Sequence, residues 1–346
     1  MTSRVRSAVA AAVVATAATA AGCSDDFPPY TRLTSLRVLA IKSEVMTEPA
    51  NASGGFQVSP GPGQTATLTP IMFVPADDVI TAWSWRWCPL SGSASNGYQC
   101  AFASAEEVMM TTGFSVPDFD LGNAGTATFT NSFPPELIAG LCGGVPGLLA
   151  APNCEGGYPI QIEMHVESMR DPGIDVVSTL RLRIDSPPPP LPPMPPNYNP
   201  VLDPTQDPLA ARPVLGAPPT TPPAPMPIPD VADPTVTLPR DRSTPIIVGL
   251  AEDQSEPYAG LNDDGVVIDQ RERMTLSWFV ESGDMEFEKT AFIQDVEPIT
   301  DTVRNGWTPA ITREYRPDTA RIVVIVRDNR GGVTSARGNV RLGASP

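Results

Sequence analysis

Residues 160–167, IQIEMHVE, decide the fold, because apolar and polar side chains alternate along the whole stretch. Successive side chains of a β-strand point to opposite faces, so this period of two predicts a strand with one buried face and one exposed face. Residues 176–184, VVSTLRLRI, repeat the alternation after a turn built on residues 171–173, DPG. Together the two segments predict a β-hairpin.

The same pattern extends outward to a strand that carries three tryptophans. In residues 80–88, ITAWSWRWC, the side chains of Trp83, Trp85 and Trp87 fall on one face. We expect residues 65–73 to be a partner strand. No segment after residue 22 shows a long apolar stripe of helical period, and only short helical turns are expected, near residues 106–110 and 135–141.

The second half of the chain repeats this plan. An early strand, a tryptophan strand that contains Trp278, and a closing hairpin recur in the same order. We expect these elements at residues 244–251, 274–280, 321–327 and 333–342. The repetition predicts an all-β chain with two β-sandwich domains.

Proline separates the two halves. Of the 42 prolines in the chain, 21 lie within residues 187–243. Proline has no amide hydrogen and a fixed φ, so this segment favours extended polyproline II over a helix or a sheet interior. We expect a first domain at residues 34–186, a Pro-rich linker at 187–243 and a second domain at 244–346. One alternative stays open, in which residues 199–202 form the first strand of the second domain.

The N-terminus has the features of an export signal. Arg4 and Arg6 precede an uncharged Ala/Val-rich run that is too short to span a bilayer and that ends near Cys23. We expect residues 1–22 to be a signal peptide and residues 23–33 to be a tether. The alternative is an ordinary signal peptide cleaved at an A-x-A site, in which Cys23 plays no part.

The end of this run resembles the lipobox of bacterial lipoproteins. Small residues precede the cysteine in Ala20-Ala21-Gly22-Cys23, although the family usually has Leu where this chain has Ala20. The resemblance implies cleavage by signal peptidase II and acylation of the Cys23 sulfur, and Ser24 implies sorting to the outer membrane of the cell envelope. Two or more acyl chains anchor a protein stably without a membrane-spanning helix.

The other four cysteines form an even set in an exported chain, which predicts disulfides. Four cysteines allow three pairings, and proximity favours Cys88 with Cys100 and Cys142 with Cys154. Each bond would close a loop of about a dozen residues and stabilise the fold by about 3 kcal/mol. A zinc site is the alternative, but the cysteine spacing lacks the tight turn that such sites use.

Charge excludes one class of partner. Removal of residues 1–22 takes away two arginines and no acid, which changes the net charge from −16 to −18. Such a charge repels nucleic acid and anionic lipid headgroups, and no basic patch is interleaved with aromatic residues. The charge is typical of a soluble envelope protein, and attraction of cations is the alternative.

Strand order provides a second resemblance. A tryptophan strand, then IVVIV at residues 322–326 and DNRGG at 328–332, looks like the C, F and G strands of immunoglobulin-like and PKD-like extracellular modules. LRVLAI at 36–41 and WRWCP at 85–89 are similar to surface lipoproteins of myxobacteria and their relatives. The resemblance implies two immunoglobulin-like β-sandwiches and carries no catalytic residue.

Motifs for catalysis are missing from the sequence. His165 is the single histidine, so no second histidine can complete a catalytic site, and no G-x-S-x-G, H-E-x-x-H or Walker motif occurs. His165 lies between Glu163 and Glu167 on the polar face of its strand, where a solvated surface explains it better than a metal site. We expect no enzymatic activity, and the remaining enzyme alternative is a glycosidase that uses a pair of carboxylates.

Two binding hypotheses remain. Asp263, Asp264 and Asp269 surround a Gly turn that would suit Ca²⁺, but the spacing departs from an EF-hand and a plain Asp-Gly turn explains the same residues. The face with Trp83, Trp85 and Trp87 would form a sugar-stacking platform if it were exposed, and core packing is the alternative.

The leading hypothesis is a non-enzymatic, lipid-anchored protein of the bacterial cell envelope, with a role in adhesion, scaffolding or partner recognition. A carbohydrate-binding module that uses the tryptophan strand is the alternative. The expected partners are the membrane, through the anchor, and an envelope protein or glycan.

Overall fold

The hairpin predicted from alternation is present. The computed structural model describes residues 30–90, 99–142, 154–185, 195–202, 214–215, 236–238, 243–262, 264–293, 296–309 and 319–342. Within it, β6 (Tyr158–Ser168) pairs antiparallel with β7 (Ile174–Leu182), with Met164 opposite Val176. The apolar residues of β6 are buried and the alternate polar ones are mostly half-buried, so the period of two does mark the core face.

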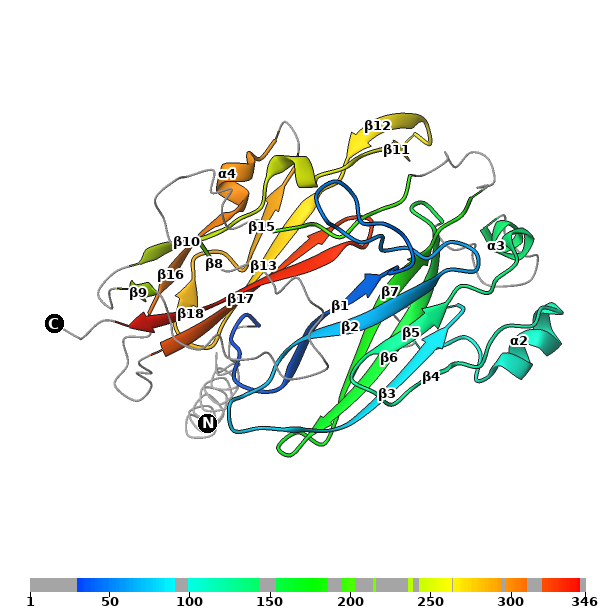
Figure 1. Cartoon of the computed structure of the whole chain (residues 1–346), viewed down its shortest axis with the longest axis horizontal. Helices are drawn as coiled ribbons and strands as arrows, with labels where there is room; N and C mark the ends of the chain where they lie inside the picture. Colours follow the sequence, from blue (N-terminus) through cyan, green and yellow to red (C-terminus); the bar gives the residue numbers. More distant parts are fainter. Residues whose placement is uncertain are drawn as a thin grey trace, which may run out of the picture.

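The first sandwich consists of two antiparallel sheets, with strand orders β1-β2-β5 and β4-β3-β6-β7 (Figure 1). The remaining bounds are β1 Arg37–Glu44, β2 Thr65–Phe73, β3 Ile80–Cys88, β4 Asp120–Gly122 and β5 Ala127–Thr130. Lettered from A to G along the chain, the sheets are A-B-E and C′-C-F-G. This is the order of an immunoglobulin-like sandwich.

Two short helices lie at one end of the first sandwich (Figure 1), in the regions where short helical turns were expected. They are α2 (Ala105–Thr112) and α3 (Pro135–Cys142). The hydroxyl of Ser104 accepts from the amide of Glu107 at the start of α2, and Gly113 ends the helix with a φ of 78°. Both signals are standard helix caps, so the local sequence fixes the length of α2.

The second sandwich has the sheet orders β14-β16-β10-β8 and β15-β13-β17-β18-β9. The bounds are β8 Val214–Leu215, β9 Val236–Leu238, β10 Thr244–Val248, β13 Met274–Val280, β14 Asp284–Met285, β15 Lys289–Phe292, β16 Arg304–Thr308, β17 Thr319–Asp328 and β18 Val333–Leu342. A separate hairpin, β11 (Pro257–Leu261) and β12 (Val267–Arg271), precedes β13, and two short helical turns, η2 (Glu252–Gln254) and α4 (Ile299–Thr302), complete the domain. Both domains are immunoglobulin-like β-sandwiches.

Each sandwich has its own hydrophobic core around buried tryptophans. Trp85 and Trp87 lie in the first core, and Trp278 and Trp307 lie in the second. The indole of Trp87 meets the edges of three phenylalanine rings at centroid distances of 5.2–5.5 Å. Such edge-to-face contacts add to the burial of a large side chain, so the tryptophan strands are the centres of both cores.

Short pieces of the Pro-rich region pack onto the sandwiches. β8 pairs parallel with β10, and β9 pairs parallel with β18, so each forms the edge of a sheet. Edges are where proline-rich sequence can join a sheet, because an edge strand leaves half of its amides unpaired. Residues 199–202, where a first strand of the second domain was left open, form no named strand, but Leu202 is buried in the second core.

A third hydrophobic core joins the two sandwiches. We call it the junction core, and its members are Leu33, Leu39, Ala40, Ile71, Phe73, Phe279, Val323, Ile325 and Val333. The sheet β1-β2-β5 of the first sandwich supplies one side, and the sheet of the second sandwich that contains β13, β17 and β18 supplies the other, so four sheets stack in succession. A bulge between Val38 and Ala40 in β1 turns both Leu39 and Ala40 toward this core.

Candidate functional site at the domain junction

The N-terminal segment crosses the junction before it enters the first sandwich. The amide of Leu33 donates to the carbonyl of Val280 at 2.7 Å, and the amide of Val280 donates to the carbonyl of Thr31 at 2.9 Å. Arg32 also pairs with Asp284 at 2.6 Å. The chain therefore begins its described course as a short strand-like addition to β13 of the second sandwich.

Two arginines of β17 reach from the second sandwich to the first. Arg321 donates to the carbonyl of Val74, lies 4.3 Å above the ring of Phe73, and pairs with Glu281 at 2.9 Å. Arg327 donates to the carbonyl of Leu39. These bonds satisfy charged groups beside the junction core and fix the register of the two sheets.

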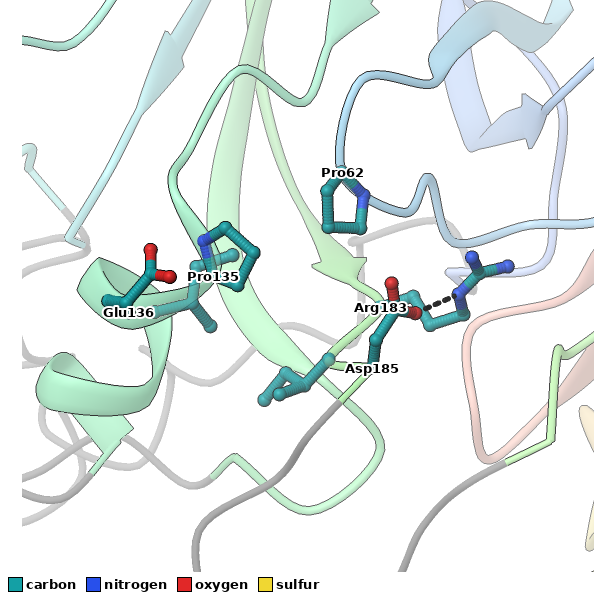
Figure 2. Close-up of a pocket in the computed structure, with 7 residues that line it drawn as sticks. Pro62, Pro135, Glu136, Arg183 and Asp185 are labelled. Carbon is teal, nitrogen blue, oxygen red and sulfur yellow. Dashed lines mark hydrogen bonds and ion pairs between the residues drawn. The ribbon is translucent and has the colours of Figure 1, made fainter.

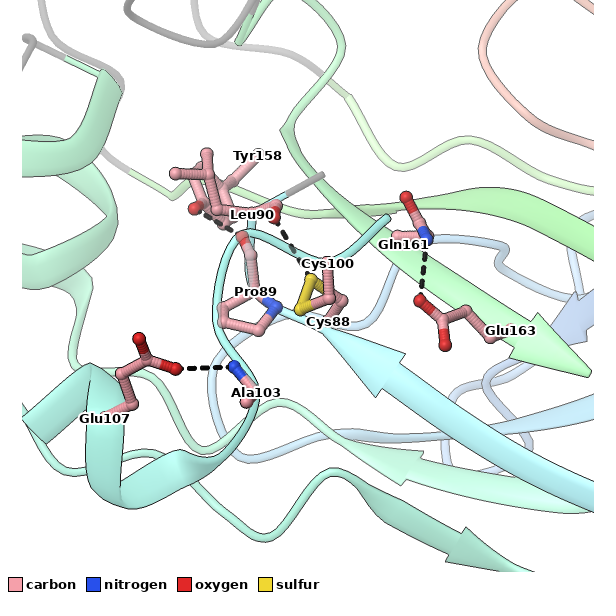
Figure 3. Close-up of a disulfide and its surroundings, with 9 residues drawn as sticks. All are labelled: Cys88, Pro89, Leu90, Cys100, Ala103, Glu107, Tyr158, Gln161 and Glu163. Atoms are coloured by element: carbon pink, nitrogen blue, oxygen red, sulfur yellow. Dashed lines mark hydrogen bonds between the residues drawn. A yellow bond between two sulfur atoms is a disulfide. The ribbon is translucent and has the colours of Figure 1, made fainter. Parts of the chain in front are cut away.

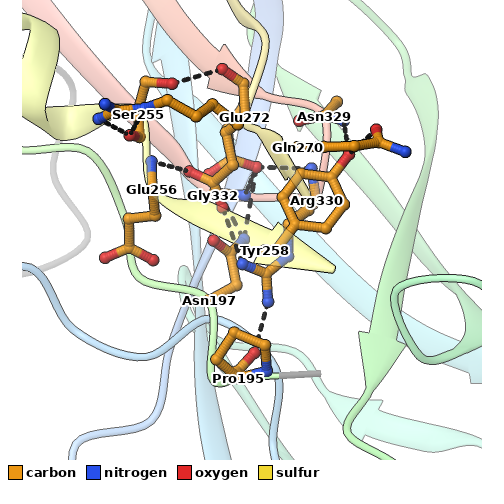
Figure 4. A network of polar contacts seen from close by, with 12 residues as sticks. Pro195, Asn197, Ser255, Glu256, Tyr258, Gln270, Glu272, Asn329, Arg330 and Gly332 are labelled. Carbon is orange, nitrogen blue, oxygen red and sulfur yellow. Dashed lines mark hydrogen bonds and ion pairs between the residues drawn. The ribbon is translucent and has the colours of Figure 1, made fainter. Parts of the chain in front are cut away.

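Next to the junction core lies a buried group of ionisable side chains, shown in Figure 4. We call Glu256, Glu272, Asp328 and Arg330 the junction acid cluster. Glu272 pairs with Arg330 at 3.1 Å, with side chains that are 0% and 5% exposed. Asp328 accepts from the amides of Arg330 and Gly332, both at 2.8 Å. Two carboxylates, of Glu272 and Asp328, are therefore buried beside Arg330, and Glu256 is half-buried next to them.

The junction acid cluster contacts both the first sandwich and the Pro-rich region. Asn51, from the first sandwich, donates to Glu256 at 3.1 Å. Asn197 donates to Asp328 at 3.4 Å, and Arg330 donates to the carbonyl of Pro195. The segment at 195–199 in turn accepts from Val58 and donates to Phe56 in the first sandwich. The cluster is thus part of the joint between the domains.

Burial changes the proton affinity of these acids. Loss of solvent, and then the negative charge of Asp328, raise the pKa of Glu272 to about 8 against the opposing charge of Arg330. Burial also raises the pKa of Asp328. It raises the pKa of Glu256 as well, although Glu256 is less buried. A carboxyl group at this junction is therefore poised to hold a proton near neutral pH.

Sequence reasoning missed this cluster. In RERM at residues 271–274, three successive charged residues favour the surface, and Asp328-Asn329-Arg330 has the composition of an exposed hairpin turn. One signal was present: IVVIV at 322–326 is apolar at every position, which indicates a strand covered on both faces. That pattern points to a third layer beside β17, although not to the acids at its end.

Both favoured disulfides are confirmed. Cys88 is bonded to Cys100, and Cys142 to Cys154, with Cα–Cα distances of 5.6 and 5.8 Å. Figure 3 shows the first bond, which ties the end of β3 to the segment before α2, next to the hydroxyl of Tyr158 that donates to the carbonyl of Pro89 at 2.7 Å. These bonds indicate an oxidising, extracytoplasmic environment.

The tryptophan platform is wrong as a sugar-binding site. Trp85 and Trp87 are 0% and 1% exposed, and their indole NH groups donate to the carbonyls of Ala124 and Asp118. Trp83 is half-buried against the same core. The face of β3 that carries the three rings therefore packs against the first core and is not free to bind a sugar.

The expected acidic ion site is only partly described, since Asp263 lies outside the described residues. Asp264 and Asp269 are exposed. Asn262 closes the turn that joins β11 to β12, since its side chain accepts from the amides of Asp264 and Val266. In the part of the chain that the structure describes, no group of three or more His, Cys, Asp or Glu side chains is placed to hold a metal ion.

His165 lies on the surface of β6, as expected from its strand face. Its Nδ1 is 2.7 Å from Asp175 and its Nε2 is 3.4 Å from Glu167. The hydrogen bond to Asp175, and then that to Glu167, raise the pKa of His165. This is a surface ion pair on adjacent strands.

A pocket of about 230 Å³ lies at the end of the first sandwich, shown in Figure 2. Its walls include Pro62, Pro135 and Ile138, and its rim carries Arg183, which pairs with Asp185 at 2.9 Å. The volume is below the range of about 300–1,000 Å³ that is usual for small-molecule sites.

Cys23 and the expected signal peptide lie outside the described residues. Among the residues that are described, no helix has the length and apolar character needed to cross a membrane.

Comparisons with known proteins find no match by sequence and only distant likenesses among solved structures. No protein-family model and no curated protein matches the sequence. Among solved structures, the chain is similar to red sea bream transglutaminase, with 10% identity over 91% of this chain and 32% of that one and a TM-score of 0.20. It is also similar to the DIP-gamma Ig1+Ig2 fragment, with 7% identity, coverage of 90% and 99%, and a TM-score of 0.17.

A third match is the three N-terminal domains of the Hoc outer capsid protein of bacteriophage RB49, with 8% identity, coverage of 90% and 71%, and a TM-score of 0.18. The chain spans only about a third of the transglutaminase chain and 22% of the Escherichia coli alpha-2-macroglobulin chain that it also matches. The immunoglobulin-like assignment rests on the sheet orders of the two sandwiches.

Proposed function

We propose that this protein is a non-enzymatic lipoprotein of the bacterial cell envelope, in which two joined immunoglobulin-like sandwiches serve as a rigid binding or scaffolding body. The observation that carries the proposal is the junction core, which holds the two domains as one unit. A body of this kind presents surfaces in a fixed relation to each other, which suits partner recognition and structural roles. Two disulfides in an exported chain support the same compartment.

The anchor is the lipobox-like Cys23. Acyl chains on this sulfur would bind the outer membrane and leave the sandwiches in the aqueous phase. The test is intact-mass analysis and membrane fractionation of the wild type beside Cys23→Ser. We expect acylated wild type in the membrane fraction and no acylated form of Cys23→Ser. The matched control is Cys142→Ser with Cys154→Ser, which also loses cysteines but should keep the lipid.

The binding role needs a separate test. Purified protein should sediment with isolated cell-envelope fragments in a saturable manner and release no soluble product from them. Reproducible turnover of an envelope polymer would contradict the non-enzymatic proposal. Sedimentation that rises linearly without saturation would contradict a specific binding role. The partner that we propose is an envelope protein or glycan.

A further inference from the structure

The junction acid cluster has an excess of negative charge, and all of its members except the half-buried Glu256 are buried. Glu256, Glu272 and Asp328 together supply three carboxylates, and Arg330 supplies one guanidinium. The nearby Arg271 donates to the carbonyl of Ser255 at 3.0 and 2.5 Å and so makes its described bonds to the main chain. Buried like charges that share one counter-charge repel each other strongly, because the low dielectric does not screen them.

The geometry around Glu272 leaves its charge poorly compensated. One carboxylate oxygen accepts from Arg330 at 3.1 Å and the other accepts from the amide of Glu256 at 3.2 Å. Arg330 also donates to the carbonyl of Pro195. Within the described residues, its Nε is buried without a hydrogen-bond partner. The same holds for Oδ1 of Asn197, which lies beside Asp328.

The groups that face Glu272 come from three directions. The turn between β17 and β18 supplies Asp328 and Arg330, and the segment that leads into β11 supplies Glu256. The first sandwich and the Pro-rich region supply only neutral groups to the cluster contacts described here, namely Asn51 and Asn197. The charge balance of the joint therefore depends on whether these carboxyl groups are protonated.

We propose that the junction acid cluster is a proton-binding site through which ambient pH controls how stably the two sandwiches stay in contact. With a proton on Glu272, its repulsion of Asp328 disappears, and the charge of Arg330 remains to offset that of Asp328 while its guanidinium donates to the carbonyl of Pro195. Loss of that proton places two neighbouring negative charges in the buried joint. The charges are then better solvated when the segment at 195–199 and the first sandwich separate from the cluster. The inference goes beyond the proposed function and does not depend on the anchor.

The direction of the effect follows from proton linkage. The pKa of Glu272 is raised by burial to about 8 in the folded protein, from 4.5 when the group is unperturbed. The closed joint binds the proton more tightly than the open joint, so the stabilisation is fully present below the unperturbed value and is lost as pH rises through the raised one. The joint should be tight in mildly acidic medium and loose in alkaline medium.

Hydrogen–deuterium exchange of the full chain in detergent micelles tests the proposal, with each rate corrected for the intrinsic effect of pH. The reporters are the amides of Val333 and Val201, which donate to the side chains of Asn199 and Gln254 and so join the Pro-rich segment to the second sandwich. The reference amides are those in the centre of β17. We expect protection at the reporters to fall about tenfold between about pH 6 and pH 9, while the reference amides keep theirs. A change of less than about twofold at the reporters would overturn the proposal.

Glu272→Gln is the decisive variant, because glutamine has the shape of the protonated acid and cannot ionise. Its reporter amides should show the same protection at both pH values, whereas Glu106→Gln, on the exposed surface of α2, should keep the wild-type pH profile. A wild-type profile in Glu272→Gln would overturn the proposal. If that variant does not fold, Glu256→Gln decides: removal of its charge should move the loss of protection to lower pH, since the proton on Glu272 then faces one negative charge fewer. An unmoved profile counts against the proposal.

Discussion

Leu33 donates its backbone amide to the carbonyl of Val280 at 2.7 Å, so the N-terminal segment is bonded to the second sandwich before it enters the first. The side chain of Leu33 is buried in the junction core beside Phe279. The described chain therefore begins at the joint between the domains and not at the far end of the first sandwich.

Phe279→Ala should destabilise the protein by about 3–5 kcal/mol, because the ring is 2% exposed in the junction core and its loss leaves a cavity. Urea denaturation measures the change. Phe287→Ala is the matched control, since Phe287 is 53% exposed in the same domain and its loss should cost about 0.5 kcal/mol or less. Equal effects of the two substitutions would show that the junction core does not stabilise the fold.

Trp87→Ala should cost about 3–5 kcal/mol of stability, because Trp87 packs edge-on against Phe119, Phe129 and Phe133. Trp83→Ala, at the half-buried end of the same strand, should cost about 1–2 kcal/mol. Thermal unfolding of both variants by circular dichroism tests this order. A folded Trp87→Ala variant with wild-type stability would reopen a surface role for the ring.

Replacement of Cys142 and Cys154 by serine should lower the free energy of unfolding by about 3 kcal/mol, since the bond closes a loop with a sequence separation of 12. This pair is a cleaner test than Cys88 and Cys100, because Cys88 is 0% exposed against 6% for Cys154, so a serine at Cys88 would bury its hydroxyl group more completely. Guanidinium denaturation with and without reductant measures the effect. The double variant should show no further loss from that bond on reduction.

The pKa of His165 should lie above its ordinary value of 6.5, because Asp175 and then Glu167 stabilise the charged imidazole. The stabilisation is present below the ordinary value and is lost as pH rises through the raised one. NMR titration can follow it without overlap, since the chain has one histidine. Asp175→Asn should lower the pKa more than Glu167→Gln does, and the reverse order would contradict the described hydrogen bonds.

Local alternation predicted the strands well, because side-chain period and burial are linked at each residue. The tryptophan strands of the two halves coincide with β3 and β13, and the closing hairpins with β6 to β7 and β17 to β18. Residues 65–73 do form a strand, β2, but its expected pairing with the tryptophan strand was wrong, because β2 lies in the opposite sheet between β1 and β5. Helical turns near Glu106 and Pro135 were also located by local signals. The disulfides could also be predicted locally, because the two cysteines of each pair are close in sequence.

The joint between the domains was beyond sequence reasoning, because it depends on contacts between distant residues. Asn51 meets Glu256 across a separation of 205 residues, and Arg32 meets Asp284 across 252. A charged side chain such as Glu272 is expected on the surface until the fold shows that Arg330 and a neighbouring domain enclose it. The hypothesis of an exposed tryptophan platform failed because alternation shows that the three rings share a face but does not show whether a second sheet covers that face.

The four stacked sheets also limit how this protein can evolve. Many immunoglobulin-like domains can be exchanged between genes as independently folding units, because the outer surface of each domain is polar. Here, excision of either sandwich would leave an apolar sheet bare, with Ile71 and Phe73 on one piece and Val323 and Ile325 on the other. Recombination should therefore transmit the pair together, as a single heritable module.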